Sequence, residues 1–343
     1  MRKRYASSVD VAKLAGVSQS AVSRTYKEGG SVSSETRNRV LAAAAELDYR
    51  PSVIPRIMLT HRSNFIALVV GGLYNPFYGQ VLEKLTTGLE LMGHQALLVH
   101  ADSGHMLDSA IPRLASYRVD AIVSPLAILS PEADKELSRL KIPIVSFNTP
   151  AHGDWVSSVC CDNTEAAAAI ADLLVRQGGR RFGFVRGPAG SPAAEDRLNG
   201  FRQRLHSLGF PRPRVVSGDF TYEGGVRAAN KLLGLADRPD AIFCANDLLA
   251  LGLIDCARRD FGLRVPEDLL VAGFDDIPVS SWPSHSLTTV VQDATAMTQA
   301  ALDILRRALA DSRHRSESVV ISGRIIERGS TRRYPAGGAG NVL

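Results

Sequence analysis

The sequence lacks any apolar run long enough to cross a membrane, and no apolar stretch of a secretory signal follows its basic start, MRKRYASSVD. Cysteine is scarce. The four cysteines, Cys160, Cys161, Cys244 and Cys256, include no CxxC pair, so we expect neither a disulfide framework nor a structural zinc site. These absences predict a cytoplasmic protein with buried, unreactive thiols.

Several enzyme motifs are also missing. There is no P-loop, no GxSxG nucleophile elbow and no HExxH, and the eight histidines are scattered without ligand spacing. Asp275 and Asp276 are neighbours, but adjacency alone does not make an acid and base pair. We therefore expect no catalytic residue, no cofactor and no metal site.

The positive charge is unevenly distributed. Residues 1–62 hold 11 Lys/Arg and 5 Asp/Glu, a balance of +6, whereas residues 63–343 hold 29 and 30, a balance of −1. A basic segment on a neutral body indicates nucleic-acid binding, because neutralising phosphates releases counterions. The alternative at this point is a solvated basic face without a partner.

Residues 9–26, VDVAKLAGVSQSAVSRTY, show helical spacing of apolar residues interrupted once, at Gly16. This pattern predicts a helix-turn-helix in which Ser8 and Ser18 cap the two helices and the second helix, about 19–26, enters the DNA major groove. An ordinary helical hairpin is the alternative. Core positions are expected at Val11, Leu14, Val17 and Val22. A third helix, capped by Ser33, would add an apolar face of Val40, Leu41, Ala44, Ala45 and Leu47.

From Phe65 onward, short apolar strands alternate with helices, which predicts an α/β fold of two doubly wound parallel-sheet lobes with a cleft between them. The expected domains are a helix-turn-helix head at 1–50, a linker and hinge helix at 51–63, a two-lobed domain at 64–334 and a disordered tail at 335–343. We assign the first lobe to about 64–157 plus 293–315. The second lobe is assigned to about 158–288 plus 318–331.

These landmarks resemble the LacI/GalR family of ligand-responsive bacterial transcription regulators. The resemblance covers about residues 7–331, and its most specific segments are VDVAKLAGVSQSAVSR, NPFY (75–78), the DN of CCDNTEAAA, DRLNGF (196–201), CANDLLALG (244–252), VAGFDDIP (271–278), LTTVVQD (287–293) and ERGST (327–331). It implies a DNA-binding head, a hinge helix and a core like a periplasmic sugar-binding protein. It also implies a homodimer on a pseudo-palindromic operator, and the lack of C-terminal heptads argues against a tetramer.

At the DNA end, Gln19, Ser20 and Ala21 occupy the family's specificity positions, with Arg24 one turn on. A glutamine side chain can hydrogen-bond to adenine, an alanine methyl can pack on the thymine methyl group, and an arginine can hydrogen-bond to guanine. Phosphate contacts are expected from Ser18, Ser23, Thr36 and Arg37. The hinge departs from the family pattern at Ser52 and Pro55, and Met58 stands in place of the minor-groove leucine.

The effector contacts that the resemblance implies are Phe77, Tyr78, Ser124, Asn148, Arg197, Phe220, Asn246, Asp275 and Gln292. Asp275 would accept two hydroxyl hydrogen bonds, Arg197 would donate a fork and Phe220 would cover an apolar sugar face. Each also has a structural alternative, such as Asn246 capping the next helix. A sugar, sugar acid or related metabolite is the leading ligand class, and a purine is the minor one.

The resemblance thus implies a transcription regulator, expected to be a repressor, whose operator affinity changes when a metabolite binds in the cleft. Two alternatives come from other classes. One is a cytoplasmic sugar-processing enzyme on the same α/β lobes, and the other is a periplasmic uptake protein. The missing motifs disfavour the first, and the missing signal and basic head disfavour the second.

Overall fold

The computed structural model describes residues 6–27, 29–51, 62–71, 74–100, 110–124, 131–151, 153–310 and 315–332. The chain divides into two compact units, Met1–Ser63 and Asn64–Leu343, each of which is described by itself. The predicted hinge residues Ser52, Pro55 and Met58 lie outside the described residues, as does the tail 335–343.

The described part of the first unit, the head, contains three helices, α1 (Ser8–Ala15), α2 (Gln19–Thr25) and α3 (Ser34–Glu46). The caps of α2 and α3 by Ser18 and Ser33 are confirmed, and so is the corner at Gly16, whose φ of 63° favours glycine. The cap predicted at Ser8 is wrong. Ser7 caps α1, because Asp10 stands three residues after it and its carboxylate accepts a hydrogen bond from the Ser7 N–H (2.9 Å), which completes a capping box.

The core of the head is built from small and β-branched residues, namely Val11, Ala12, Ala15, Val22, Val40, Ala43 and Ala44. The predicted core positions Leu14, Leu41 and Ala45 are wrong: the two leucines are 47% and 45% exposed, and Ala45 is exposed as well. The buried face is centred on Ala15 in α1 and on Val40 in α3, and each leucine lies about 100° around its helix from that centre. The alanines let the helices approach closely and leave the leucines on the surface.

The second unit has two parallel sheets, which confirms the predicted fold class. The first sheet has the order β11-β5-β4-β3-β1-β2, and the second has the order β7-β6-β8-β9. The strands of the first are β1 (Phe65–Val70), β2 (Gln95–His100), β3 (Ala121–Ser124), β4 (Ile144–Phe147), β5 (Val156–Cys161) and β11 (Ser318–Ile321). Those of the second are β6 (Phe182–Arg186), β7 (Arg214–Ser217), β8 (Ala241–Cys244) and β9 (Leu270–Ala272).

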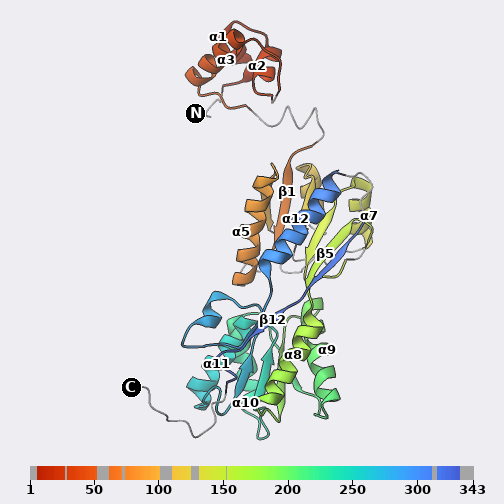
Figure 1. Cartoon of the computed structure of the whole chain (residues 1–343), viewed down its shortest axis with the longest axis vertical. Coiled ribbons are helices and arrows are strands. Elements are labelled where there is room, and N and C mark those ends of the chain that lie inside the picture. Colours follow the sequence, from red (N-terminus) through yellow and green to blue (C-terminus); the bar gives the residue numbers. More distant parts are fainter. Residues whose placement is uncertain are drawn as a thin grey trace. The chain divides into compact units, whose positions relative to one another are not determined.

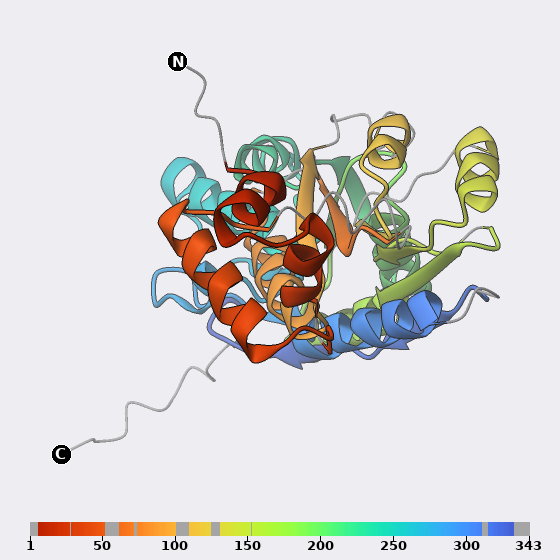
Figure 2. The same ribbon diagram turned by 90° about the horizontal axis from the view of Figure 1, so that it is seen from above.

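Helices cover both faces of the first sheet, as Figures 1 and 2 show: α5 (Pro76–Leu91) and α12 (Ala294–Ala310) on one, α6 (Ile111–Ser116) and α7 (Pro131–Leu140) on the other. The strand pattern explains this. Ile66 and Leu68 of β1 join the core of α5, whereas the alternate residues Ala67 and Val69 join that of α6 and α7. A strand buried on both faces reads as a continuous apolar run.

The second sheet is flanked by α8 (Asn163–Arg176), α9 (Pro192–Ser207), α10 (Tyr222–Leu233) and α11 (Asp247–Phe261). Beyond β9 come a 3-10 turn (Pro278–Ser281) and β10 (Thr289–Val291), which pairs antiparallel with β12 (Arg324–Ile326). The chain therefore passes between the lobes three times, after β5, after β10 and between β11 and β12.

Two strands lie in a different lobe from the one we assigned. From the sequence we expected residues 158–161 and 318–321 in the second lobe, but β5 pairs with β4 and with β11 in the first sheet. Strand partners are long-range choices that local apolar patterning does not specify.

Candidate ligand pocket and nucleic-acid interface

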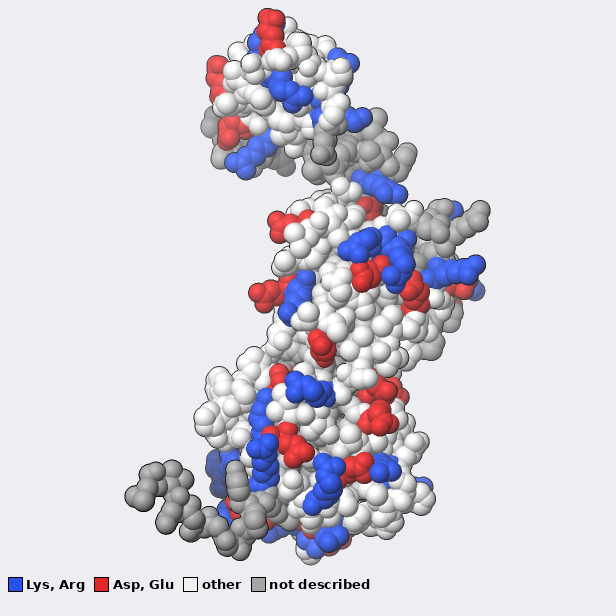
Figure 3. All heavy atoms as spheres, in the orientation of Figure 1, with Lys and Arg blue, Asp and Glu red and all other residues white. Residues whose placement is uncertain are grey.

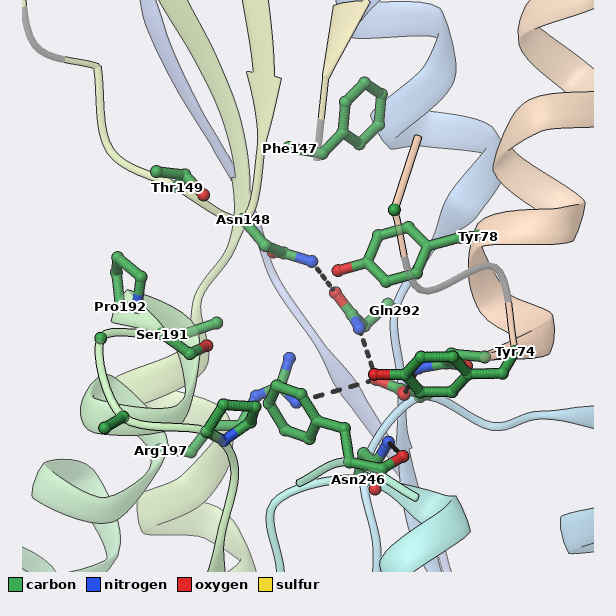
Figure 4. A pocket seen from close by; sticks show the side chains of 18 residues that line it. Tyr74, Tyr78, Phe147, Asn148, Thr149, Ser191, Pro192, Arg197, Asn246 and Gln292 are labelled. Carbon is green, nitrogen blue, oxygen red and sulfur yellow. Dashed lines mark hydrogen bonds and ion pairs between the residues drawn. The ribbon is translucent and has the colours of Figure 1, made fainter. Parts of the chain in front are cut away.

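A pocket lies between the lobes at the carboxyl ends of strands from both sheets (Figure 4). Seven of the predicted effector residues line it: Tyr78, Asn148, Arg197, Phe220, Asn246, Asp275 and Gln292. The remaining lining residues are Gly71, Tyr74, Asn75, Phe147, Thr149 and the 188–193 segment.

Two predicted effector residues do not reach the pocket. Phe77 is 2% exposed and packs in the core beneath α5, and Ser124 is fully buried at the end of β3. Phe77 and Tyr78 are consecutive on a helix and project about 100° apart, so only one of them faces the pocket. The structure places Tyr78 there and sends Phe77 into the core.

Arg197 and Asp275, a buried ion pair, are the only charged side chains among the described residues that line the pocket. Arg197 and Asp275 are 3% and 5% exposed, and Arg197 Nη1 lies 3.7 Å from Asp275 Oδ1. Burial raises the pKa of the Asp275 carboxyl, and the Arg197 guanidinium opposes that rise. One positive and one negative side chain leave the pocket close to electrically neutral.

The fork predicted from Arg197 to a ligand stays a prediction, and much of the guanidinium already has partners within the protein. Its Nε donates to Asn163 Oδ1 (2.8 Å) and its Nη1 to the Ala245 carbonyl (2.5 Å), while its plane lies 3.6 Å from the centre of the Phe274 ring. Within the described part of the chain, Nη2 makes no hydrogen bond. Arg197 can therefore offer a ligand one nitrogen with two hydrogens.

A chain of side-chain amides joins the lobes at Asp275. Asn75 Nδ2 donates to Asp275 Oδ2 (2.7 Å), and Gln292 Nε2 donates to Oδ1 (2.6 Å). Asn148 Nδ2 in turn donates to Gln292 Oε1 (2.7 Å), as the dashed lines of Figure 4 show. Each carboxylate oxygen thus already accepts one hydrogen, and a second acceptor direction remains on each.

The amide of Asn246 is used within the protein, so the capping alternative is the one the structure supports. Its Oδ1 accepts from the Leu249 N–H (3.0 Å) at the start of α11, and its Nδ2 donates to the Phe220 carbonyl (3.1 Å). Phe220 has a φ of 62°, which is strained for an aromatic residue. Its ring lies on Gly187, where any Cβ would collide with it. Asn246 and Gly187 thus hold the Phe220 ring at the pocket.

Four aromatic side chains give the pocket its apolar surface: Tyr74, Tyr78, Phe147 and Phe220. Burial raises the pKa of Tyr78 to about 12, so its phenol keeps its proton at neutral pH. Figure 4 shows this hydroxyl directed into the pocket beside Gln292. The site therefore combines flat apolar faces with a few polar groups.

Asp247, next to Asn246 in sequence, is a structural residue that the sequence analysis missed. It is fully buried and accepts hydrogen bonds from the Ile277 N–H (2.9 Å), Ser280 Oγ (2.7 Å) and Thr289 Oγ1 (2.6 Å). Burial raises its pKa to about 7. Its three donors come from the segments beside Asp275 and Gln292, so Asp247 fixes the backbone behind the pocket. The signal available was the position of an acid at the start of an apolar helix.

In the head, α2 presents Ser18, Gln19, Ser20, Ser23 and Arg24 to the solvent. Ala21 does not belong to this set, because it is buried, with only 8% of its surface exposed. The predicted thymine contact through its methyl group is therefore corrected.

Arg37 and Thr36 of α3 already have partners within the head. Arg37 Nη1 donates to the Thr25 carbonyl (3.0 Å), which ties α3 to the end of α2, and Thr36 Oγ1 accepts from Ser33 Oγ (2.9 Å). Phosphate contacts by these two residues stay predictions, as does the contact by Met58, which lies outside the described residues.

Over the visible face of the second unit, Lys/Arg and Asp/Glu side chains are interspersed (Figure 3), in keeping with its near-zero charge balance. Within the described ranges, no three His, Cys, Asp or Glu side chains are grouped to hold a metal ion. No helix among those residues is long and apolar enough to span a membrane. Three cysteines are buried and Cys160 is half-buried, and burial raises the pKa of the thiol of Cys160 and of Cys161.

Comparisons with known proteins match both units. Residues 9–52 match the model for bacterial regulatory proteins of the lacI family, and residues 171–331 match the periplasmic binding protein-like domain. The HTH-type transcriptional repressor PurR of Klebsiella pneumoniae (strain 342) is 31% identical over 94% of this chain and 95% of its own. The repressor CytR of Escherichia coli (strain K12) is 33% identical over 95% and 96%. A solved complex of the transcriptional regulator CelR with cellobiose has a TM-score of 0.70 and 29% identity, covering 95% of this chain and 99% of that one.

Proposed function

Since this chain belongs to the LacI family of bacterial regulatory proteins, we propose that its pocket binds an uncharged, polyhydroxylated ring compound that changes its affinity for operator DNA. The chain is a DNA-binding transcription regulator that responds to a small metabolite. Its curated relatives are repressors, which are not enzymes, and we propose that this pocket likewise binds without catalysing a reaction. A cytoplasmic location follows for a protein whose partner is chromosomal DNA.

The observation that carries the proposed ligand class is the buried pair of Arg197 and Asp275, 3.7 Å apart. Each charge compensates the other, so the free pocket has no net charge to attract an ion. A ligand carboxylate would add a third, uncompensated charge in a site with little access to water, which costs several kcal/mol. Of the classes that the sequence allowed, a neutral sugar is therefore favoured over a sugar acid.

The other groups of the pocket suit the same class. The rings of Tyr74 and Phe220 can cover the apolar faces of a sugar, and Arg197 Nη2 and the Tyr78 hydroxyl can donate to its oxygens. The second acceptor directions of Asp275 can take hydroxyl hydrogens. The cellobiose in the CelR complex is a neutral sugar, which supports extending this class to the present chain.

On the DNA side, we propose that the chain is a homodimer in which Ser18, Gln19, Ser20, Ser23 and Arg24 of each α2 face one half of a pseudo-palindromic operator. Arg24, the one cation of this set, would contact guanine or a phosphate. The basic balance of residues 1–62 supports the phosphate contacts.

Titration calorimetry on the full chain tests the proposal. The panel consists of neutral mono- and disaccharides, the uronic acid of each and a set of nucleosides. We expect binding within the neutral sugars and at least tenfold weaker binding of each matched acid. Preferential binding of the acids or of the nucleosides would refute the proposed ligand class. Operator duplexes selected from a random library then report whether the bound sugar weakens or strengthens DNA binding, and failure to select any duplex would refute the regulatory role itself.

A further inference from the structure

A hydrogen bond links the first residues of the two helices in the helix-turn-helix. Gln19 Nε2, at the start of α2, donates to Ser8 Oγ, at the start of α1, over 2.9 Å. The two residues are 11 apart in sequence, so this contact depends on how α1 and α2 pack. Gln19 is exposed and Ser8 is half-buried.

The backbone at both ends of this contact is fixed by separate caps. Ser7 and Asp10 form the capping box of α1, which leaves the Ser8 hydroxyl free of any capping role. Ser18 caps α2 by accepting from the Ala21 N–H (3.2 Å). The contact therefore joins two first-turn residues whose backbones are held independently of it.

The contact determines which groups Gln19 can offer to a base. A carboxamide has two N–H hydrogens and one carbonyl oxygen. Since one hydrogen points to Ser8, one N–H and Oε1 of the carboxamide are left for a base. A donor beside an acceptor is the pattern that complements N7 and N6 of adenine in the major groove.

We propose that Ser8 is a positioning residue for DNA recognition, which holds the Gln19 carboxamide so that it reads adenine at one position of each half-site. A long, exposed glutamine otherwise samples many rotamers, and ordering it on binding costs conformational entropy. The Ser8 contact orders it beforehand. This inference rests on the proposed placement of α2 against the operator and assigns Ser8 a role distinct from the helix cap expected from the sequence.

The experiment uses the full chain and duplexes selected by the wild-type protein from a random library. Competition binding with each single-base variant of the selected site measures discrimination at every position. We expect Gln19→Ala to abolish the adenine preference at one position of the half-site, where the wild type discriminates about tenfold. Ser8→Ala should lower discrimination about threefold at that same position only, and Ser8→Thr, which keeps a hydroxyl, should restore it.

Ser34→Ala is the matched control, because Ser34, like Ser8, is a serine at the first position of a helix and follows a capping serine, Ser33. It should leave discrimination unchanged at every position. The double variant S8A/Q19A should discriminate no less than Q19A alone, since Ser8 acts through Gln19.

Three results would overturn the inference: a uniform change across all positions in Ser8→Ala, an additive loss in the double variant, or a Gln19-dependent position that prefers another base. If the wild type selects no duplex, the proposed DNA-binding function fails, and that failure is distinct from these three. Circular dichroism of each variant separates these outcomes from loss of the folded head.

Discussion

Replacing Asp275 by asparagine should change the kind of ligand that the pocket accepts. The substitution removes the one negative charge among the described lining residues and leaves the buried Arg197 without its charged partner. The variant pocket therefore carries a net positive charge, and a ligand carboxylate can take the place of the missing side chain. We expect the preference to move from neutral sugars toward sugar acids.

The magnitude follows from the 3.7 Å separation of Arg197 Nη1 and Asp275 Oδ1. At an effective dielectric constant of about 20, two unit charges at that distance interact by about 4 kcal/mol. Removing one partner of a buried pair costs about 3–5 kcal/mol, because the other charge stays desolvated. We expect the free energy of unfolding of the ligand-free variant to fall by about this amount.

The assay is titration calorimetry of the wild type and Asp275→Asn with D-glucose and D-glucuronate, or with whichever matched pair the panel identifies. The ratio of acid to neutral affinity should rise at least tenfold in the variant. Asp276→Asn is the matched control, because Asp276 is the next residue, also pairs with an arginine (Arg328, 2.6 Å) and does not line the pocket. An unchanged ratio in Asp275→Asn would show that the charge balance of the pocket does not select its ligand.

Three further predictions concern the surroundings of the pocket. Asn75→Ser keeps a cap on α5 but loses the donor to Asp275, so it should lower the free energy of unfolding, measured by urea titration, by about 1.5–3 kcal/mol. Asn75→Ala also loses the cap and should lower it by about 1 kcal/mol more. Equal losses in the two variants would contradict separate cap and donor roles. Burial raises the Asp247 pKa to about 7, so the folded state binds this proton more tightly than the unfolded state does. The contribution of Asp247 to the free energy of unfolding is therefore fully present below pH 4. It is lost as the pH rises through 7, which lowers that free energy by about 4 kcal/mol. Urea titrations at pH 5 and pH 8 should show that decline reduced in Asp247→Asn, and an identical decline would refute the assignment. Gly187→Ala should displace the Phe220 ring and weaken sugar binding at least fivefold in titration calorimetry. The circular dichroism spectrum should change little. An unaltered sugar affinity would show that the Phe220 ring does not cover the ligand.

Much of the fold is readable from local pattern. The apolar runs of β1 and β4 and the serine caps of α2 and α3 each depend on a few neighbouring residues, so the sequence predicts them. The lobe to which β5 belongs depends instead on strand partners far along the chain. The exposure of Leu14 likewise depends on which face of α1 packs against the other helices of the head.

The site shows the same division. Family motifs led to Tyr78, Asp275 and Gln292, but the motif NPFY does not reveal that Phe77 points into the core. Asn75 stood in that motif as well, and its role became visible only when α5 was placed against Asp275. Residues that act through a partner side chain are found once the partner is located in space.

The three passages of the chain between the lobes affect the order in which the protein can be completed during synthesis. All four strands of the second sheet have been synthesised once the chain reaches residue 272. In contrast, α5 has no α12 beside it until residues 294–310 have been added, and the first sheet is completed only when β11 ends at residue 321. Until then the β5 edge is unpaired, and an open strand edge invites pairing with other chains. The lobe encoded first is therefore finished last, and a nascent chain stalled near its C-terminus would expose its N-terminal lobe.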